Sequence, residues 1–189
     1  MITVAPIHYT DHTKALIVDT TSRSTGWSKE LSPFVLTNTR GNIVENFWQF
    51  LKVYPDQVDA NGIPTEEWRK WAMRGISSSN PQRYPKGKGA KPLFHYYKGE
   101  KLGYVQARKK IYIPQYANAV LRTQAYDVLR DVNESGIDIV LLCFDGYQTN
   151  KPLGYVVHDL TKSMGHAFVL KMLLINDPIL NECGPIRRP

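Results

Sequence analysis

The stretch that most constrains the fold is a short apolar run, residues 137–144. Its last six residues read Ile-Val-Leu-Leu-Cys-Phe and contain no charged side chain. A run of this length with β-branched residues predicts a strand covered on both faces, within a sheet or under helices. Asp145-Gly146 follows directly and is typical of a turn. The rest of the chain is therefore expected to supply elements that cover this strand.

Most of the remaining sequence shows helical periodicity. Apolar residues recur at helical spacing, and glycine or proline marks the segment ends. The predicted helices run from Val44 to Pro55, Pro64 to Gly75, Pro114 to Gly136 and Thr161 to Leu174, and Ala15–Val18 is strand-like. The sequence therefore predicts one helix-rich α+β domain, residues 1–189, with a short buried strand or small sheet.

The positive charge is concentrated in one segment. The chain has 24 Lys and Arg against 17 Asp and Glu, a formal net charge of +7. Residues 69–112 hold 12 positive residues and one negative residue, so this segment carries +11 and the remainder −4. Seven aromatic residues are interleaved with these charges. The pattern suits a polyanion with rings that stack, or a solvated basic surface whose aromatics belong to the core.

Within this segment, residues 77–92 are predicted to form a flexible basic loop. Proline and glycine exclude regular structure there, and loops of this length are usually functional or disordered. Lys86-Gly87-Lys88-Gly89 lacks the full phosphate-loop pattern. The following residues, 102–113, fit a helix or a strand, and in either case Arg108, Lys109 and Lys110 are expected to be exposed.

The composition argues against several functional classes. The two cysteines cannot form a disulfide framework, and Cys143 is expected to be a buried neutral thiol. The histidines and cysteines show no metal-ligand spacing, so no metal and no cofactor is predicted. No segment reads as a secretory signal or approaches the roughly 20 apolar residues of a membrane helix. These features predict a cytoplasmic protein without a membrane partner.

Two carboxylates stand out as candidate catalytic groups. Glu45 lies near the start of an aromatic helix, where burial would raise its pKa for proton transfer, or where it would cap the helix. Asp145 follows the buried strand, where many folds display functional groups, although Asp-Gly is also a common turn. The sequence leaves both alternatives open.

One part of the chain resembles a known family. Leu31-Ser32-Pro33-Phe34 precedes a helix in which Glu45, Trp48, Gln49 and Lys52 follow the spacing Glu-x-x-Trp-Gln-x-x-Lys. This pair of elements resembles the NADAR family, whose helix-rich members are N-glycosidases. They cleave ribose–nitrogen bonds in riboflavin-pathway intermediates or ADP-ribosylated nucleobases. The family's later Trp-Gly and Gly-rich elements correspond loosely to residues 143–147 and 162–166.

The resemblance implies roles for particular residues. Glu45 would be the catalytic carboxylate, Trp48 and Lys52 would frame the pocket, and Phe34 would be the aromatic of the first element. Asp145 is a possible second carboxylate. The basic segment adds candidate phosphate ligands, namely Arg83, Lys86, Lys88 and Arg108. The expected substrate is an ADP-ribosyl or other nucleotide-like compound.

Two other functions remain open at this point. The first is a non-catalytic protein that binds DNA or RNA through the same basic segment. The second is a small interaction protein without a ligand site.

Overall fold

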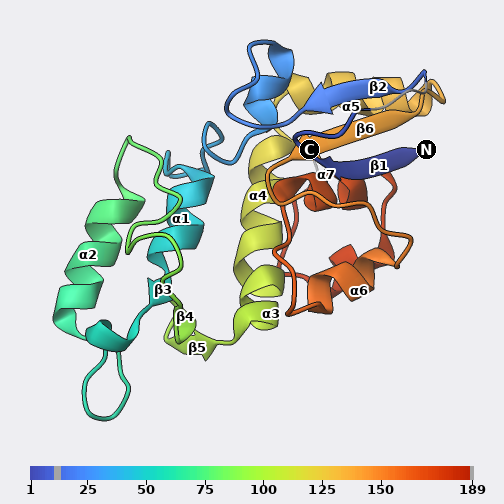
Figure 1. Ribbon diagram of the computed structural model, residues 1–189. Coiled ribbons are helices and arrows are strands. Elements are labelled where there is room, and N and C mark those ends of the chain that lie inside the picture. Colours follow the sequence, from blue (N-terminus) through green and yellow to red (C-terminus); the bar gives the residue numbers. More distant parts are fainter. Residues whose placement is uncertain (11–13, 188–189) are drawn as a thin grey trace.

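A parallel sheet forms the centre of one half of the molecule. The computed structural model describes residues 1–10 and 14–187 (Figure 1). Its first sheet has three parallel strands in the order β1-β6-β2, with bounds β1 Ile2–Pro6, β2 Leu16–Asp19 and β6 Ile139–Cys143. Every residue of β6 is buried, so the predicted interior strand is confirmed. The strand-like run before Asp19 is also confirmed, as β2.

Both faces of β6 are covered, as its uniform hydrophobicity requires. Ile139, Leu141 and Cys143 point into the main core, which also contains helix α7 (His166–Leu174). Val140 and Leu142 form a smaller cluster on the opposite face with Ala5, Tyr9 and Ala15. The central strand is thus flanked on both edges and packed on both faces.

A second sheet lies on the other side of the molecule. Its three antiparallel strands have the order β3-β4-β5, with bounds β3 Lys52–Val53, β4 Phe94–Tyr97 and β5 Glu100–Leu102. The β4–β5 turn places Lys98 and Gly99 at φ 51° and 84°, the left-handed backbone of a tight hairpin turn. These strands were not predicted, because each is too short to show a clear alternation.

The two helices on either side of β3 in the chain pack on each other. Helix α1 spans Val44–Phe50 and α2 spans Glu66–Ile76, so both predicted helices exist with shifted ends. The Thr65 hydroxyl accepts a hydrogen bond from the Trp68 amide and caps α2. Gly75 does not end α2, which continues to Ile76, and Gly75 lies against the Phe50 ring of α1.

The long helix predicted from Pro114 to Gly136 is wrong at both its start and its middle. Helix α3 (Tyr104–Ala107), a π turn (Arg108–Tyr112) and α4 (Ile113–Val120) run on from one another, which settles residues 104–113 as helical. The wider π turn lies directly before Pro114. Proline has no amide hydrogen to donate to the preceding turn of a regular α-helix. The helical path then breaks, and Thr123 caps a separate helix, α5 (Gln124–Glu134).

The C-terminal helices also differ from the prediction. Helix α7 begins at His166 rather than Thr161, because Gly165 has an extended backbone and serves as its N-cap. A short helix, α6 (Leu153–His158), was not predicted. Short 3₁₀ turns cover Trp27–Leu31, Pro55–Gln57 and Pro178–Glu182.

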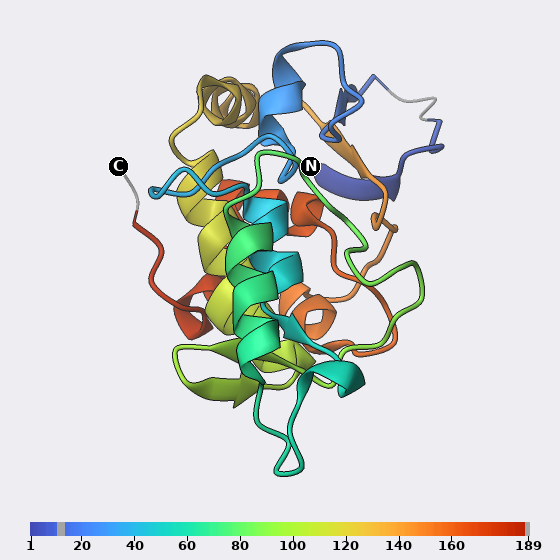
Figure 2. The same cartoon turned by 90° about the vertical axis from the view of Figure 1, so that its left-hand side faces the viewer.

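Helix α4 stands between the two halves. In Figure 1 the parallel sheet, α6 and α7 lie on one side of α4, and α1, the second sheet and α2 lie on the other. Figure 2 shows residues 77–92 and the C-terminal segment on opposite sides of this assembly. The α+β prediction is confirmed. Within the described residues, no helix has the length and apolar character needed to cross a membrane.

Replacing Gly75 by alanine is expected to destabilise the protein. A Cβ at Gly75 would lie 2.0 Å from Phe50 Cδ1, so the α1–α2 contact must open. We expect a loss of about 1–3 kcal/mol in the free energy of unfolding, despite the better helix propensity of alanine. Urea titration of both proteins measures this change.

Gly154→Ala is the matched control. A Cβ at this helical glycine would lie 3.7 Å from Ile179 Cδ1, an ordinary van der Waals distance. Its stability should equal or exceed that of the wild type. Equal stability of the two variants would contradict the close packing of α1 on α2.

Candidate functional site

A cavity of about 390 Å³ lies where the two halves meet, at the carboxyl ends of β2 and β6. In open sheets with parallel strands, ligands commonly bind at this edge. The segments after the two strands contribute Thr21, Ser22, Arg23, Phe144 and Asp145. The remaining walls come from residues 32–34, α1, Lys52 on β3, the 104–112 helix, the loop at residues 83–84, and residues 163–166.

Glu45 is the buried carboxylate of this cavity. Its side chain lies on α1, the residue is 6% exposed, and Gln49 Nε2 donates a hydrogen bond to its Oε1 at 2.7 Å. Burial raises its pKa to about 6, while the hydrogen bond from Gln49 and the charge of Lys52 act in the opposite direction. A carboxyl group with such a pKa exchanges protons readily near neutral pH.

Glu45 lies in the first turn of α1, where its negative charge is favourable, but its side chain makes no capping hydrogen bond. The amides of Val44 and Glu45 at the start of α1 donate to the carbonyls of Leu36 and Pro33 instead. These bonds also hold residues 33–36 against the helix N-terminus. They therefore explain how Phe34 and Glu45, which are separated in the sequence, come to line one cavity.

Lys52 is linked to Glu45 through a side-chain amide. Its Nζ donates to Gln49 Oε1 at 2.6 Å, while the amide nitrogen of the same Gln49 donates to Glu45. The spacing 45, 49, 52 places these side chains on one helical face and its extension. Burial lowers the pKa of Lys52 to about 8, and the neighbouring Glu45 charge limits this decrease. The lysine remains protonated at neutral pH.

Asp145 lies in the same cavity as Glu45. Its Oδ2 accepts a hydrogen bond from Arg83 Nη2 at 2.9 Å, and the charge of Asp145 contributes to the raised pKa of Glu45. The Asp-Gly turn is also present, since the Gly146 amide donates to the Cys143 carbonyl. The predicted turn is therefore confirmed, and the two carboxylates line one cavity.

Two arginines flank one aromatic ring at the cavity rim. The guanidinium carbons of Arg23 and Arg83 lie 4.9 and 5.3 Å from the centre of the Phe144 ring. Arg83 is paired with Asp145, whereas Arg23 has no carboxylate partner among the described residues. The rim therefore carries positive charge that is available to an anionic ligand.

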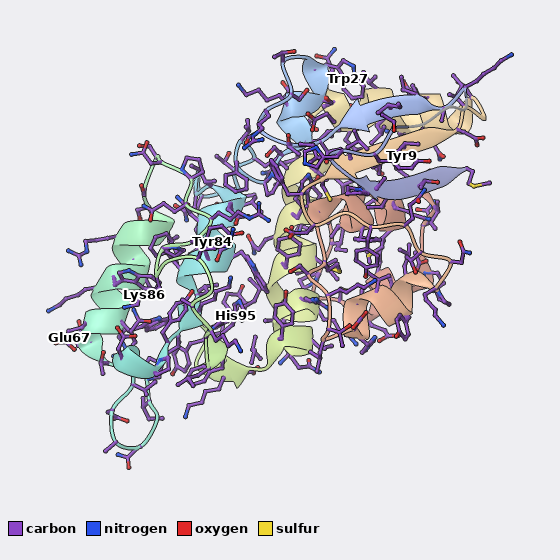
Figure 3. The ribbon with its side chains drawn as sticks, viewed as in Figure 1. Tyr9, Trp27, Glu67, Tyr84, Lys86 and His95 are labelled. Atoms are coloured by element: carbon purple, nitrogen blue, oxygen red, sulfur yellow. The ribbon has the colours of Figure 1, made fainter. Side chains whose placement is uncertain are left out.

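Aromatic side chains form another wall. Trp48, Tyr104 and Tyr112 line the cavity together with Phe34. His95, on β4, stacks on Trp48 with ring centres 4.1 Å apart and lies between α1 and α4 (Figure 3). Burial lowers the pKa of His95 to about 3, and its Nε2 has no hydrogen-bond partner within the described structure. His95 is therefore a neutral packing partner of Trp48.

Arg108 is buried, so its predicted exposure is wrong. Its guanidinium donates to the carbonyls of Val156, Val157, Asp159 and Lys162, and the residue is 1% exposed. It also lies over the Tyr104 ring, with 4.2 Å from Cζ to the ring centre. Arg108 touches the cavity, but its hydrogen bonds hold the segment between α6 and α7.

Lys86 and Lys88 lie outside the cavity. Lys86 forms an ion pair with Asp56 and Lys88 is exposed, whereas Arg83 and Tyr84 of the same loop reach the cavity. Figure 3 shows Lys86 beside α2. The structure thus brings together the following predicted residues: Phe34, Glu45, Trp48, Lys52, Arg83, Arg108 and Asp145.

The basic segment 69–112 is not one continuous patch. Five of its positive residues, Arg69, Arg83, Lys86, Lys109 and Lys110, form ion pairs in the described structure, and Arg108 is buried. Several of its aromatics serve the core: Trp71, Phe94 and Tyr96 pack around Val53 and Trp68. Tyr84 and Tyr104 line the cavity.

Sequence reasoning missed His166 and the residues after β2. His166 Nε2 lies 2.9 Å from the Thr20 carbonyl, which only accepts, so this nitrogen carries the proton. Burial lowers the pKa of His166 to about 4, so the ring is neutral at pH 7. Arg23 follows β2, a strand parallel to β6, and this position is the signal that could have identified it. The signal can be used only when the strand order of the sheet is known.

No group of three or more His, Cys, Asp or Glu side chains among the described residues could hold a metal ion. The cavity contains carboxylate, ammonium, guanidinium and aromatic groups. This set of groups suits acid–base chemistry on an organic anion.

The fold and the cavity define an α+β protein with a carboxylate site at the ends of two parallel strands. The chain belongs to the family DUF6939, described as a family of unknown function, which it matches over residues 5–170. This match includes the cavity-lining residues named above. No curated protein and no solved structure matches the chain.

Replacing Arg108 by glutamine is expected to destabilise the protein severely. The change leaves main-chain carbonyls of residues 156–162 without their donors, at about 1–3 kcal/mol for each buried group that water cannot reach. We expect a total loss of at least about 3 kcal/mol in the free energy of unfolding. Lys110→Gln removes a surface ion pair and should change stability by less than about 1 kcal/mol. Similar losses in both variants would contradict this role of Arg108.

Stability should fall as the pH decreases from 6.5, and His95 should contribute to this fall. The native pKa of His95 is about 3 and its ordinary value 6.5, so only the unfolded chain binds this proton between these values. The slope contributed by His95 is about 1.4 kcal/mol per pH unit. His95→Leu should remove that slope in urea titrations between pH 6 and 4. His158→Leu, at an exposed histidine, is the control, and an unchanged slope in His95→Leu would refute the prediction.

Proposed function

We propose that this protein is an N-glycosidase-like hydrolase that cleaves the ribose–nitrogen bond of an ADP-ribosyl or ribosyl nucleobase. The observation that carries the proposal is Glu45, a buried carboxylate that lines the cavity and has a pKa raised to about 6. The similarity of residues 31–52 to the NADAR motif supports the same assignment.

The position of Glu45 suits the charge that develops in such a reaction. Breaking the bond leaves positive charge on the ribose C1′, which an ionised carboxylate in a partly water-excluded site stabilises. With a pKa of about 6, Glu45 is mostly ionised at pH 7 and can also accept a proton from the attacking water. The water oxygen bonds to C1′, and the electrons of the broken bond go to the leaving nitrogen.

Lys52 is suited to assist both the Glu45 carboxylate and the leaving nitrogen in this step. Its positive charge, relayed by Gln49, favours the ionised form of Glu45. Its pKa of about 8 allows it to supply a proton at neutral pH, which the leaving nitrogen requires. Asp145 would then act mainly by positioning Arg83 through their ion pair.

The other walls fit the two ends of the proposed substrate. Trp48, Tyr104 and Tyr112 offer ring faces for a nucleobase, and Arg23 and Arg83 offer positive charge for phosphate. The cavity volume of about 390 Å³ is within the usual range of small-molecule sites. The predicted cytoplasmic location fits the two cysteines, which are both free thiols.

Glu45→Gln is expected to keep the fold and abolish base release. The substitution preserves shape and the acceptor for Gln49 but removes the negative charge, so the rate should fall at least about a hundredfold. Release of guanosine or thymidine from their ADP-ribosylated forms, and of free base from phosphoribosyl nucleobases, followed by liquid chromatography, measures this rate. In the wild type the rate should decrease as the pH falls through about 6.

Glu66→Gln, at an exposed glutamate on α2, is the matched control and should behave as the wild type. Circular dichroism verifies that Glu45→Gln is folded. Undiminished release by Glu45→Gln would refute the catalytic assignment. If the wild type releases neither a nucleoside nor a base from any compound of the panel, the proposed function is refuted.

A further inference from the structure

A second cavity, of about 520 Å³, lies on the other side of α4. Its walls come from the loop at residues 38–39, the β4–β5 hairpin, α4 and the C-terminal segment at residues 185–187. In Figure 2 this C-terminal segment rises beside α4 towards the C-terminus, on the side opposite the loop at residues 77–92. This cavity shares no lining residue with the Glu45 cavity.

The lining of the second cavity is strongly cationic. Lys98, Lys110, Arg122 and Arg187 line it, and no aspartate or glutamate is among its described lining residues. Lys110 is paired with Glu100, and Arg122 donates to the Thr37 carbonyl, which leaves the arginine charge without a counter-charge. Lys98 and Arg187 form no ion pair within the described part of the chain. Like charges gathered in a concave surface attract a ligand with several negative charges.

This charged wall is held in place by the fold. The Asn118 side chain bonds the C-terminal segment twice: its Nδ2 donates to the Pro185 carbonyl, and its Oδ1 accepts from the Arg187 amide at 2.7 Å. The left-handed backbone of the β4–β5 turn fixes the position of Lys98. The cations therefore come from separate elements whose backbones are fixed, rather than from one mobile tail.

The cavity also offers a ring and a side-chain amide. Tyr97 is partly buried and meets Phe47 edge-on at 6.1 Å, so its ring orientation is restrained. Lys98 Nζ lies over this ring, 5.3 Å from its centre, so a base that stacks on Tyr97 displaces the Lys98 ammonium towards a phosphate.

Gln115 lines the same cavity, where its Oε1 accepts a hydrogen bond from Asn38 Nδ2 at 3.5 Å, and Asn38 Oδ1 accepts from the amides of Arg40 and Asn42. The amide that can meet a base is therefore the Gln115 Nε2 group. A phosphodiester backbone matches the cations, while bases match the ring and the amide, which is the combination found in single-strand binding sites.

We propose that this second cavity binds single-stranded nucleic acid. Phosphates contact Lys98, Arg122 and Arg187, and a base stacks on Tyr97. The site is independent of the proposed hydrolase chemistry, because none of its residues lines the Glu45 cavity. The site uses Tyr97, Lys98 and Lys110 of the basic segment and adds Arg122 and Arg187, which lie outside residues 69–112.

Fluorescence anisotropy with labelled 12-nucleotide single-stranded DNA and RNA between 50 and 200 mM salt tests the charge component. In Lys98→Gln/Arg187→Gln, the slope of log K against log salt should shrink by about 1.4, since each lost phosphate contact removes about 0.7. Lys70→Gln/Arg74→Gln, on the exposed face of α2, removes the same charge and should keep the wild-type slope. Absence of wild-type binding, or equal effects in the two pairs, would overturn the proposal.

Two further variants locate the site and test for base recognition. Tyr97→Leu should weaken binding at least about fivefold, because it removes a stacking surface. Glu45→Gln and Arg23→Gln should bind as the wild type does. Loss of binding in Arg23→Gln would place the nucleic acid in the first cavity instead. Two results together would show that the site binds any polyanion rather than nucleic acid. In these results Tyr97→Leu binds the oligonucleotide as tightly as the wild type, and inorganic polyphosphate displaces the oligonucleotide equally well from both proteins.

Discussion

The burial of β6 is the constraint on which the arrangement of the site depends. Because all five residues of β6 are buried, the strand requires neighbours on both edges and cover on both faces. Both neighbours are parallel to it, so the segments that leave β2 and β6 emerge at the same edge. That edge brings Arg23, Phe144 and Asp145 together, and α1 approaches it from the other half of the molecule with Glu45.

Much of the fold could be predicted where a local pattern was strong. The apolar run at 139–143 became the central strand, and the periodic segments around α1 and α2 became helices. Predictions failed where tertiary contacts decide the structure. The strands β4 and β5 depend on pairing, and the position of Arg108 depends on distant carbonyls of residues 156–162. Charge alone therefore placed Arg108 on the surface, although its donors are used inside the protein.

The candidate site shows the same limit. The motif at residues 45–52 identified Glu45, Trp48 and Lys52, since its spacing places them on one helix and its extension. The loop residues were harder to rank, because composition does not distinguish Arg83, which pairs with Asp145, from Lys86, which pairs with Asp56. Arg23 and His166 enter the site only through the parallel topology, which no local pattern reveals.

The Glu45 site also reduces the stability of the fold that holds it. The native pKa of Glu45 is raised from 4.5 to about 6, so its stabilising contribution is present below pH 4.5 and lost as the pH rises through 6. Above that pH the ionised carboxylate costs about 2 kcal/mol relative to the unfolded chain. Gln49 and Lys52 offset part of the desolvation but do not remove it. A buried amide at position 45 would avoid this cost, and the proton transfer proposed for Glu45 is a step that an amide could not perform.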